Sequence, residues 1–350
     1  MSATTGTAAI DSPGPAGQGT IDGGPDGTGF VHSFRTDSGV ALPGEGRLEM
    51  AVDIHFPKQL VEPAMMLVCL PGGGISRRYF DLRPPESQHD GSFSFARRMT
   101  ARGFIVALAD HLGIGESSRP KDGYALSSDV LSQAADHVHG AIRAQVQAQY
   151  GKKFAHLCSI GVGHSMGGMI TVLQQAQHQT HEAIVLLGFS TRGLPEYVPQ
   201  PLHGLARDPV ALRAQLATHA RQMFKEPYPR LQPTAESREM FAGDRADARG
   251  VAALKLAGDE PVLPVPGFHA ILPDNVAREA ASIDVPVFVA VGDLDIVGPS
   301  GEVTRAYERS RAVVSYIMPN TGHCHFLFAS RFALFEAIAA WTRLVTQHGA

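Results

Sequence analysis

Cysteine is scarce in this chain, and basic residues are not in excess. Three cysteines in 350 residues do not indicate a disulfide framework, and we interpret Cys69 and Cys158, which lie in apolar runs, as inert core thiols. Lysine and arginine total 30 against 34 acidic residues, giving a formal net charge of −4 with no basic block. This charge balance argues against nucleic acid as a partner.

Long apolar runs are also absent. No stretch approaches the about 20 residues of a membrane-spanning helix, so we expect no membrane span. Residues 1–29 are small, polar and interrupted by glycine and proline, which is typical of a disordered tail. They lack the basic start and apolar segment of a secretory signal, and we therefore expect a cytoplasmic protein. The sequence leaves the oligomeric state open and is compatible with a homo-oligomer.

The chain does contain a repeated alternation of strand-like and helix-like segments. Its composition, 44% hydrophobic and 18% charged, is that of a globular protein with a substantial core. We predict strands at 48–56 (an edge strand), 64–70, 103–110, 156–162, 183–189, 285–293 and 313–319, and helices at 93–102, 127–150, 166–177, 302–310 and 332–345. The alternation predicts an α/β fold, with a mostly parallel sheet flanked by helices on both faces. Ligands bind such sheets at the carboxyl ends of the strands.

The alternation breaks after Ser190. Beyond it we predict a helix at 208–224, with Asp208 as its N-cap and Pro209 in its first position, among proline-rich segments without a long strand. Such long insertions in compact domains usually have a function. The predicted organisation is a disordered tail at 1–29, a core at 30–190 and 276–350, and a mostly helical cap at 191–275.

One G-x-S-x-G pattern occurs, as Gly163-His164-Ser165-Met166-Gly167. A buried strand is predicted just before it, and an apolar helix begins at Met166. The glycines permit a turn so tight that the hydroxyl of Ser165 projects from the edge of the sheet. The amides at the start of the helix point to the same place. The alternative is an ordinary glycine-rich turn between a strand and a helix.

This context resembles the α/β-hydrolase superfamily. Residues 109–117, ADHLGIGES, are similar to the D-x-x-G-x-G-x-S loop that follows the fourth strand in that family, and residues 70–76, LPGGGIS, sit where the family has its oxyanion loop. Pro71 replaces the usual histidine of this loop. The resemblance covers roughly 30–190 and 276–350, and it implies the α/β-hydrolase fold, with an eight-stranded type of sheet and a cap.

The resemblance also implies a serine nucleophile, an acid and a histidine base, in that order along the chain. Ser165 is the expected nucleophile. His323 follows the last strand in a Gly-His pair and matches the family's base, with His325 as its rival. The family's acid lies in a G-x-x-D-x-x-x-P pattern, which selects Asp295. Asp293 is the alternative, and either aspartate could instead bind its own backbone in a turn.

Oxyanion and substrate contacts follow from the same resemblance. The backbone N–H groups of Met166 and Gly73, with Gly74 next, are expected to bind the oxyanion. Packing in the core is the alternative for each aromatic residue near the site. Four residues are expected to contact substrate: Phe189, His164, Phe268 and Leu272.

Other reactive or charged residues near these motifs have simpler interpretations. Arg77 follows the oxyanion loop and could contact substrate or face solvent. Cys324 lies between two histidines, but no turn presents it, so we interpret it as packing beside the site. The His-x-His pair has no Asp, Glu or His cluster at ligand spacing around it, so we expect no metal.

These observations together predict a serine hydrolase that cleaves a carboxylic ester or lactone through an acyl-enzyme intermediate, without a metal or organic cofactor. An acyltransferase or a carbon–carbon bond hydrolase would use the same residues, and a binding protein on this fold would have lost catalysis. Serine at the turn argues against haloalkane dehalogenases and epoxide hydrolases, which use aspartate there. The expected partner is a small-molecule ester or lactone, whose identity and chain length do not follow from the sequence.

Overall fold

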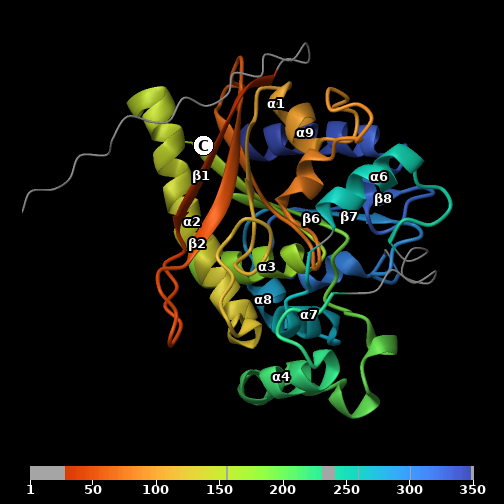
Figure 1. The fold of residues 1–350 in the computed structure, drawn as a ribbon. Coiled ribbons are helices and arrows are strands. Elements are labelled where there is room, and N and C mark those ends of the chain that lie inside the picture. The colour runs from red at the N-terminus through yellow and green to blue at the C-terminus, as the bar shows by residue number, and fades with distance from the viewer. Residues whose placement is uncertain (1–27, 155–156, 231–240, 259, 300, 348–350) are drawn as a thin grey trace, which may run out of the picture.

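The computed structural model describes residues 28–154, 157–230, 241–258, 260–299 and 301–347, and these contain one eight-stranded sheet (Figure 1). The strand order is β1-β2-β4-β3-β5-β6-β7-β8. The strands are β1 (Thr28–Asp37), β2 (Glu49–Pro57), β3 (Met65–Leu70), β4 (Ile105–Ala109), β5 (Cys158–His164), β6 (Ala183–Leu187), β7 (Val287–Gly292) and β8 (Val313–Met318). β2 is antiparallel to β1 and β4, and the other neighbours are parallel. The predicted mostly parallel sheet is confirmed.

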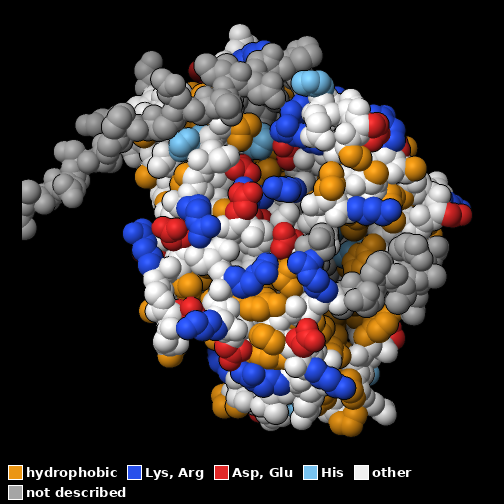
Figure 2. Space-filling view, in the orientation of Figure 1, with side chains coloured by type: hydrophobic (Ala, Val, Ile, Leu, Met, Phe, Trp, Pro, Cys, Tyr) orange, Lys and Arg blue, Asp and Glu red, His pale blue; other side chains and the backbone are white. Residues whose placement is uncertain are grey.

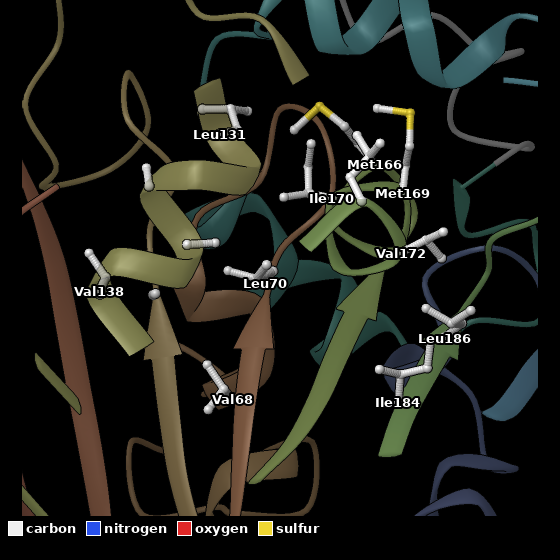
Figure 3. Close-up of a cluster of buried hydrophobic side chains, with 14 of the residues drawn as sticks. Val68, Leu70, Leu131, Val138, Met166, Met169, Ile170, Val172, Ile184 and Leu186 are labelled. Carbon is white, nitrogen blue, oxygen red and sulfur yellow. The ribbon is translucent and has the colours of Figure 1, made fainter. Parts of the chain in front are cut away.

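Helices cover both faces of the sheet (Figure 1). One face carries α2 (Ser128–Tyr150), α3 (Met166–His178) and α8 (Ala277–Ser282), and the other carries α1 (Phe95–Thr100) and α9 (Arg331–Gln347). Figure 3 shows side chains of β3 and β6, such as Val68 and Ile184, beneath apolar side chains of α2 and α3. A separate buried cluster fills the opposite face, so the sheet is apolar on both sides, as buried parallel strands require.

The ends of α2 follow the sequence signals. The Ser127 hydroxyl accepts a hydrogen bond from the Val130 N–H at 3.2 Å, which satisfies one of the free amides at the start of the helix. Gly151 follows the last turn with φ of 75°, a conformation that glycine adopts at little cost. The predicted start and end of this helix are therefore confirmed.

Two predictions at the edges of the sheet were wrong. β2 is not an edge strand, because β1 pairs along its outer side. We did not predict β1, since residues 29–37 are all half-buried or exposed and carry little hydrophobic pattern. The helix predicted at 302–310 is only a 3₁₀ turn, η7 (Val303–Ala306). Only Val303 and Tyr307 of that segment are buried, which is too little apolar surface to stabilise a longer helix.

The predicted tail lies outside the described residues, apart from Thr28 and Gly29, which begin β1.

The described residues of the long connection from β6 to α8 are mostly helical. The connection contains α4 (Pro209–Phe224), α6 (Ala248–Ala257), α7 (Pro264–Ile271) and short 3₁₀ turns, and no strand lies in its described residues. α4 starts as predicted, with the Asp208 carboxylate accepting from two amides of the first turn. α4 and α7 share a small apolar cluster, and α7 also packs on α2 and α3.

The contact between α7 and the core includes a buried polar link. The imidazole of His269 lies 2.9 Å from the Ser128 hydroxyl through Nδ1 and 2.9 Å from the Asn275 carbonyl oxygen through Nε2. All three residues are buried. Satisfied polar links of this kind are costly to break in a dry environment, so α7 is held firmly against the first turn of α2.

The surface gives two further observations. In Figure 2, acidic and basic side chains are interspersed on the face shown. None of the helices in the described ranges combines the length and the apolar character needed to cross a membrane.

Candidate active site

The turn between β5 and α3 is as tight as the G-x-S-x-G pattern predicts. Ser165 has φ of 53° and ψ of −122°, a backbone conformation that costs a non-glycine residue energy and is characteristic of functional sites. A Cβ atom on Gly163 would lie 2.4 Å from the Gly167 carbonyl oxygen, and one on Gly167 would lie 2.2 Å from the Leu70 carbonyl oxygen. Both glycines are therefore required sterically, and the turn is more than a flexible loop.

Three side chains from separate strand ends meet at this turn. The His323 Nε2 atom lies 2.9 Å from the Ser165 hydroxyl, and its Nδ1 atom lies 2.7 Å from Oδ1 of Asp295. Ser165 follows β5, Asp295 follows β7 and His323 follows β8, so the carboxyl ends of parallel strands bring them together. This chain of contacts can take a proton from the hydroxyl and stabilise the imidazolium that results.

The Asp295 carboxylate is buried and charged. Burial alone would raise the pKa of Asp295, but the imidazoles of His323 and His325 outweigh it and hold that pKa well below its usual range. The side chains of Asp295 and His323 are almost entirely shielded from solvent. The acid therefore stays ionised across the neutral pH range.

The two rival residues occupy different positions. Asp293 is exposed, and its Oδ1 atom accepts a hydrogen bond from the Thr321 N–H at 3.1 Å, so it joins the loop after β7 to the loop after β8. The His325 ring contacts Asp295, with Nε2 at 2.8 Å from Oδ2, and its Nδ1 atom has no partner among the described residues. The geometry thus brings Asp295 and His323 to Ser165, and leaves Asp293 aside.

The glycine loop after β3 lies against the nucleophile. A Cβ atom on Gly72 would be 3.1 Å from the Ser165 Cβ atom, and one on Gly73 would be 3.8 Å from the Met166 sulfur. Gly74, with φ of 71°, faces Val262 of the cap segment instead. Residues 72 and 73 are therefore the part of this loop that lies closest to Ser165 and Met166.

A buried network holds this loop in place from behind. The Arg77 N–H donates to Asp110 at 2.6 Å, and its guanidinium is paired with Asp110 and with Asp53. The buried His111 imidazole lies 2.9 Å from the Pro71 carbonyl oxygen through Nε2. The D-x-x-G segment after β4 thus anchors the glycine loop after β3, and Arg77 neither faces solvent nor lines the cavity beside Ser165.

A cavity of about 60 Å³ opens beside Ser165 and His323. Besides Ser165 and His323, the only described lining residue with a polar side chain is Ser190. The Ser190 hydroxyl already donates a hydrogen bond to the Val297 carbonyl oxygen at 2.9 Å. No charged side chain lines it among the described residues. The remaining lining residues are Met166, Gly188, Phe189, Gly193, Leu194, Ala270, Ile271, Ile296 and Val297.

The predicted substrate contacts fall into two groups. Phe189 lines the cavity. His164 does not: it is fully buried behind the nucleophile, with its ring centre 4.4 Å from that of Tyr79. Phe268 and Leu272 face the apolar cluster inside the cap, while their neighbours at 270 and 271 reach the cavity. We correct the prediction accordingly, because a helix sends adjacent side chains in different directions.

Gly188, which we did not single out, is part of the site. It directly follows β6 with φ of 58°, and a Cβ atom on it would lie 3.0 Å from Nδ1 of His323 and 3.2 Å from Oδ2 of Asp295. A glycine directly after the strand that neighbours β5 was the available signal. Only glycine leaves this space without strain.

No three His, Cys, Asp or Glu side chains gather to hold a metal ion anywhere in the described ranges. The Cys324 thiol is fully buried, and burial raises its pKa. It is therefore a poor nucleophile at neutral pH.

Solved structures share this arrangement of strands and helices. A thermophilic esterase from Thermogutta terrifontis superposes with a TM-score of 0.53 at 17% identity, over 89% of this chain and 99% of the other. A carboxyl esterase from Bacillus coagulans gives 0.59 at 17% identity, over 89% and 98%. The enol-lactonase from Burkholderia xenovorans LB400 gives 0.51 at 18% identity, over 87% and 99%. At such identities the likeness establishes the fold, which is that of the α/β-hydrolases.

Sequence comparison adds the family. No curated protein matches the chain significantly. A family model described as "Serine aminopeptidase, S33" matches residues 88–327, more than half of the chain, and the chain therefore belongs to this family of α/β-hydrolases.

Proposed function

We propose that this protein is a serine hydrolase that cleaves small carboxylic esters or lactones through an acyl-enzyme. The observation that carries the proposal is the continuous chain of contacts from Ser165 through His323 to Asp295, with distances of 2.9 and 2.7 Å. A serine hydroxyl is a weak nucleophile until a base is within hydrogen-bond reach. The strained turn at Ser165 and the esterase and lactonase neighbours support the same conclusion.

The proposed reaction starts with attack of the Ser165 hydroxyl on the ester carbonyl, while His323 takes its proton. The backbone N–H groups of Met166 and Gly73 bind the oxygen that becomes negative, and one such donor typically lowers the barrier by about 3 kcal/mol. The intermediate then expels the alcohol, which receives the proton from His323. Water repeats the sequence on the acyl-enzyme, releases the acid and restores the hydroxyl of Ser165.

Esters and lactones fit the cavity better than peptides do. An aminopeptidase must bind the charged amino end of its substrate, and no carboxylate lines the described cavity. Both carboxylate oxygens of the nearby Asp295 are already hydrogen-bonded, one to His323 and one to His325. An uncharged group can enter the cavity without leaving a charge unpaired, which would be costly in a dry site.

The size of the cavity indicates short substrates. A single buried water needs about 10–15 Å³, so a cavity of about 60 Å³ favours a group of only a few non-hydrogen atoms. A propionyl or butyryl group, or a small lactone ring, meets this limit. Each methylene that fails to fit an apolar pocket raises the activation free energy that corresponds to kcat/KM by about 1–3 kcal/mol.

Covalent labelling tests the catalytic part of the proposal. A fluorophosphonate probe is expected to label the wild-type protein at Ser165, and Ser165→Ala is expected to abolish both labelling and ester hydrolysis. Wild-type protein that resists the probe would contradict the proposal and favour a ligand-binding protein. Product analysis with and without an alcohol acceptor then separates hydrolysis from acyl transfer.

A chain-length series tests the substrate class. We expect kcat/KM for p-nitrophenyl butyrate to exceed that for the octanoate by at least about tenfold. Leu194→Ala enlarges the cavity and should raise the octanoate-to-butyrate ratio. Leu202→Ala is the matched control, because Leu202 packs in the cap cluster and does not line the cavity. Equal rates on both esters in the wild type would contradict the size argument.

A further inference from the structure

The Asp295 carboxylate contacts a second imidazole besides that of His323. Its Oδ1 atom lies 2.7 Å from Nδ1 of His323, and its Oδ2 atom lies 2.8 Å from Nε2 of His325. The side chains of Asp295 and His325 are completely shielded from solvent. Within the part of the chain that the structure describes, His325 is the only hydrogen-bond donor to Oδ2.

The protonation state of His325 follows from its surroundings. An ionised carboxylate oxygen can only accept, so Nε2 of His325 must carry the hydrogen. Burial lowers the pKa of His325, which leaves the ring neutral and its Nδ1 atom without a hydrogen. That Nδ1 atom is buried and has no partner among the described residues. An N–H group in the same place would be a buried donor left unpaired, which is rare in proteins.

The local backbone fixes the position of this ring. His325 begins a short 3₁₀ turn, η8 (His325–Leu327), immediately after the loop that carries His323. Its N–H donates to the His323 carbonyl oxygen at 3.1 Å, and the ring centre of His164 lies 6.1 Å from its own. Because His323 and His325 belong to one short hydrogen-bonded segment, they approach the Asp295 carboxylate together.

We propose that His325 is a positioning residue for the candidate triad, an inference that rests on the proposed function. The terminal torsion of an aspartate is broad, so a carboxylate held through one oxygen alone can rotate away from its partner. The His325 N–H occupies Oδ2 and leaves Oδ1 facing Nδ1 of His323. Orientation of the base, in turn, determines how well it takes the proton from Ser165.

A matched pair of substitutions tests this role. His325→Gln keeps an N–H donor near the position of Nε2, while His325→Met has similar length and no donor. We expect Met to lower kcat by about 10- to 100-fold, because a misplacement of the reacting groups by about 1 Å costs about 100-fold, with KM nearly unchanged. Gln should recover most of that loss. Cys324→Ala is the control for packing damage in the same loop, and it should retain kcat within about twofold.

Several results would overturn the inference. A Met variant that labels with fluorophosphonate and turns over as fast as wild type would do so, as would Gln and Met variants that lose kcat equally while both remain folded. If the Met variant does not fold, ring ¹⁵N chemical shifts of the wild type decide, and a His325 ring protonated on Nδ1 contradicts the inference. Failure of the wild type itself to label at Ser165 would instead refute the proposed function.

Discussion

Replacement of Gly188 by alanine separates backbone strain from damage to the site. Gly188 has φ of 58°, and an added Cβ atom would lie 3.0 Å from Nδ1 of His323 and 3.2 Å from Oδ2 of Asp295. The left-handed backbone costs an alanine about 1–2 kcal/mol. The contacts require the His323–Asp295 pair to move by a few tenths of an ångström. Since a 1 Å error in a reactive geometry costs about 100-fold, a displacement of a few tenths of an ångström should lower kcat by about three- to tenfold.

The chain offers a matched control for this substitution. Gly44 also has a positive φ, of 76°, but a Cβ atom added to it would meet no other described segment within 4 Å, so Gly44→Ala carries only the backbone cost. Urea unfolding should show a loss of about 1–2 kcal/mol of unfolding free energy in Gly44→Ala, and at least as large a loss in Gly188→Ala. Ester hydrolysis should fall only in Gly188→Ala. Wild-type kcat in Gly188→Ala, or an equal loss of kcat in Gly44→Ala, would refute the reasoning.

Two further predictions concern the acid and the buried histidines. Asp295→Asn should lower kcat by about 10⁴-fold, because the amide stabilises the wrong imidazole tautomer. Asp293→Asn should change kcat little. Steady-state kinetics checks both variants, and equal losses of kcat would contradict Asp295 as the acid. Acid should also destabilise the fold. Burial lowers the pKa of His111 and of His139 from 6.5 to about 4, so the unfolded chain binds more protons below pH 6.5 and stability falls as the pH drops toward 4. At pH 5 each histidine should contribute about 2 kcal/mol to this loss, and unfolding free energies that are equal at pH 7 and pH 5 would contradict it.

The elements that could be predicted from sequence are those whose signals are local. The G-x-S-x-G turn, the two ends of α2, the N-cap of α4 and the apolar strands each depend on a few adjacent residues, and they are found where they were predicted. The selection of Asp295 rested on family resemblance, and the structure brings that residue to His323. Its catalytic role stays a prediction.

The rest depends on distant contacts that no local pattern records. The burial of Arg77 requires Asp53 and Asp110, which lie on other segments. The choice between Leu272 and Ile271 as a cavity residue depends on how α7 is rotated on the core. Gly188 matters only because two strands beyond β6 deliver His323 and Asp295 beside it.

The buried link from His269 to Ser128 bears on how the enzyme would discriminate between substrates. Ala270 and Ile271, the next two residues of α7, form one wall of the cavity, and the hydrogen bond between His269 and Ser128 joins this end of α7 to the core helix α2. Chain-length preference would then depend on the position of this wall. A single bulkier or smaller side chain on that wall would be enough to change the preferred chain length.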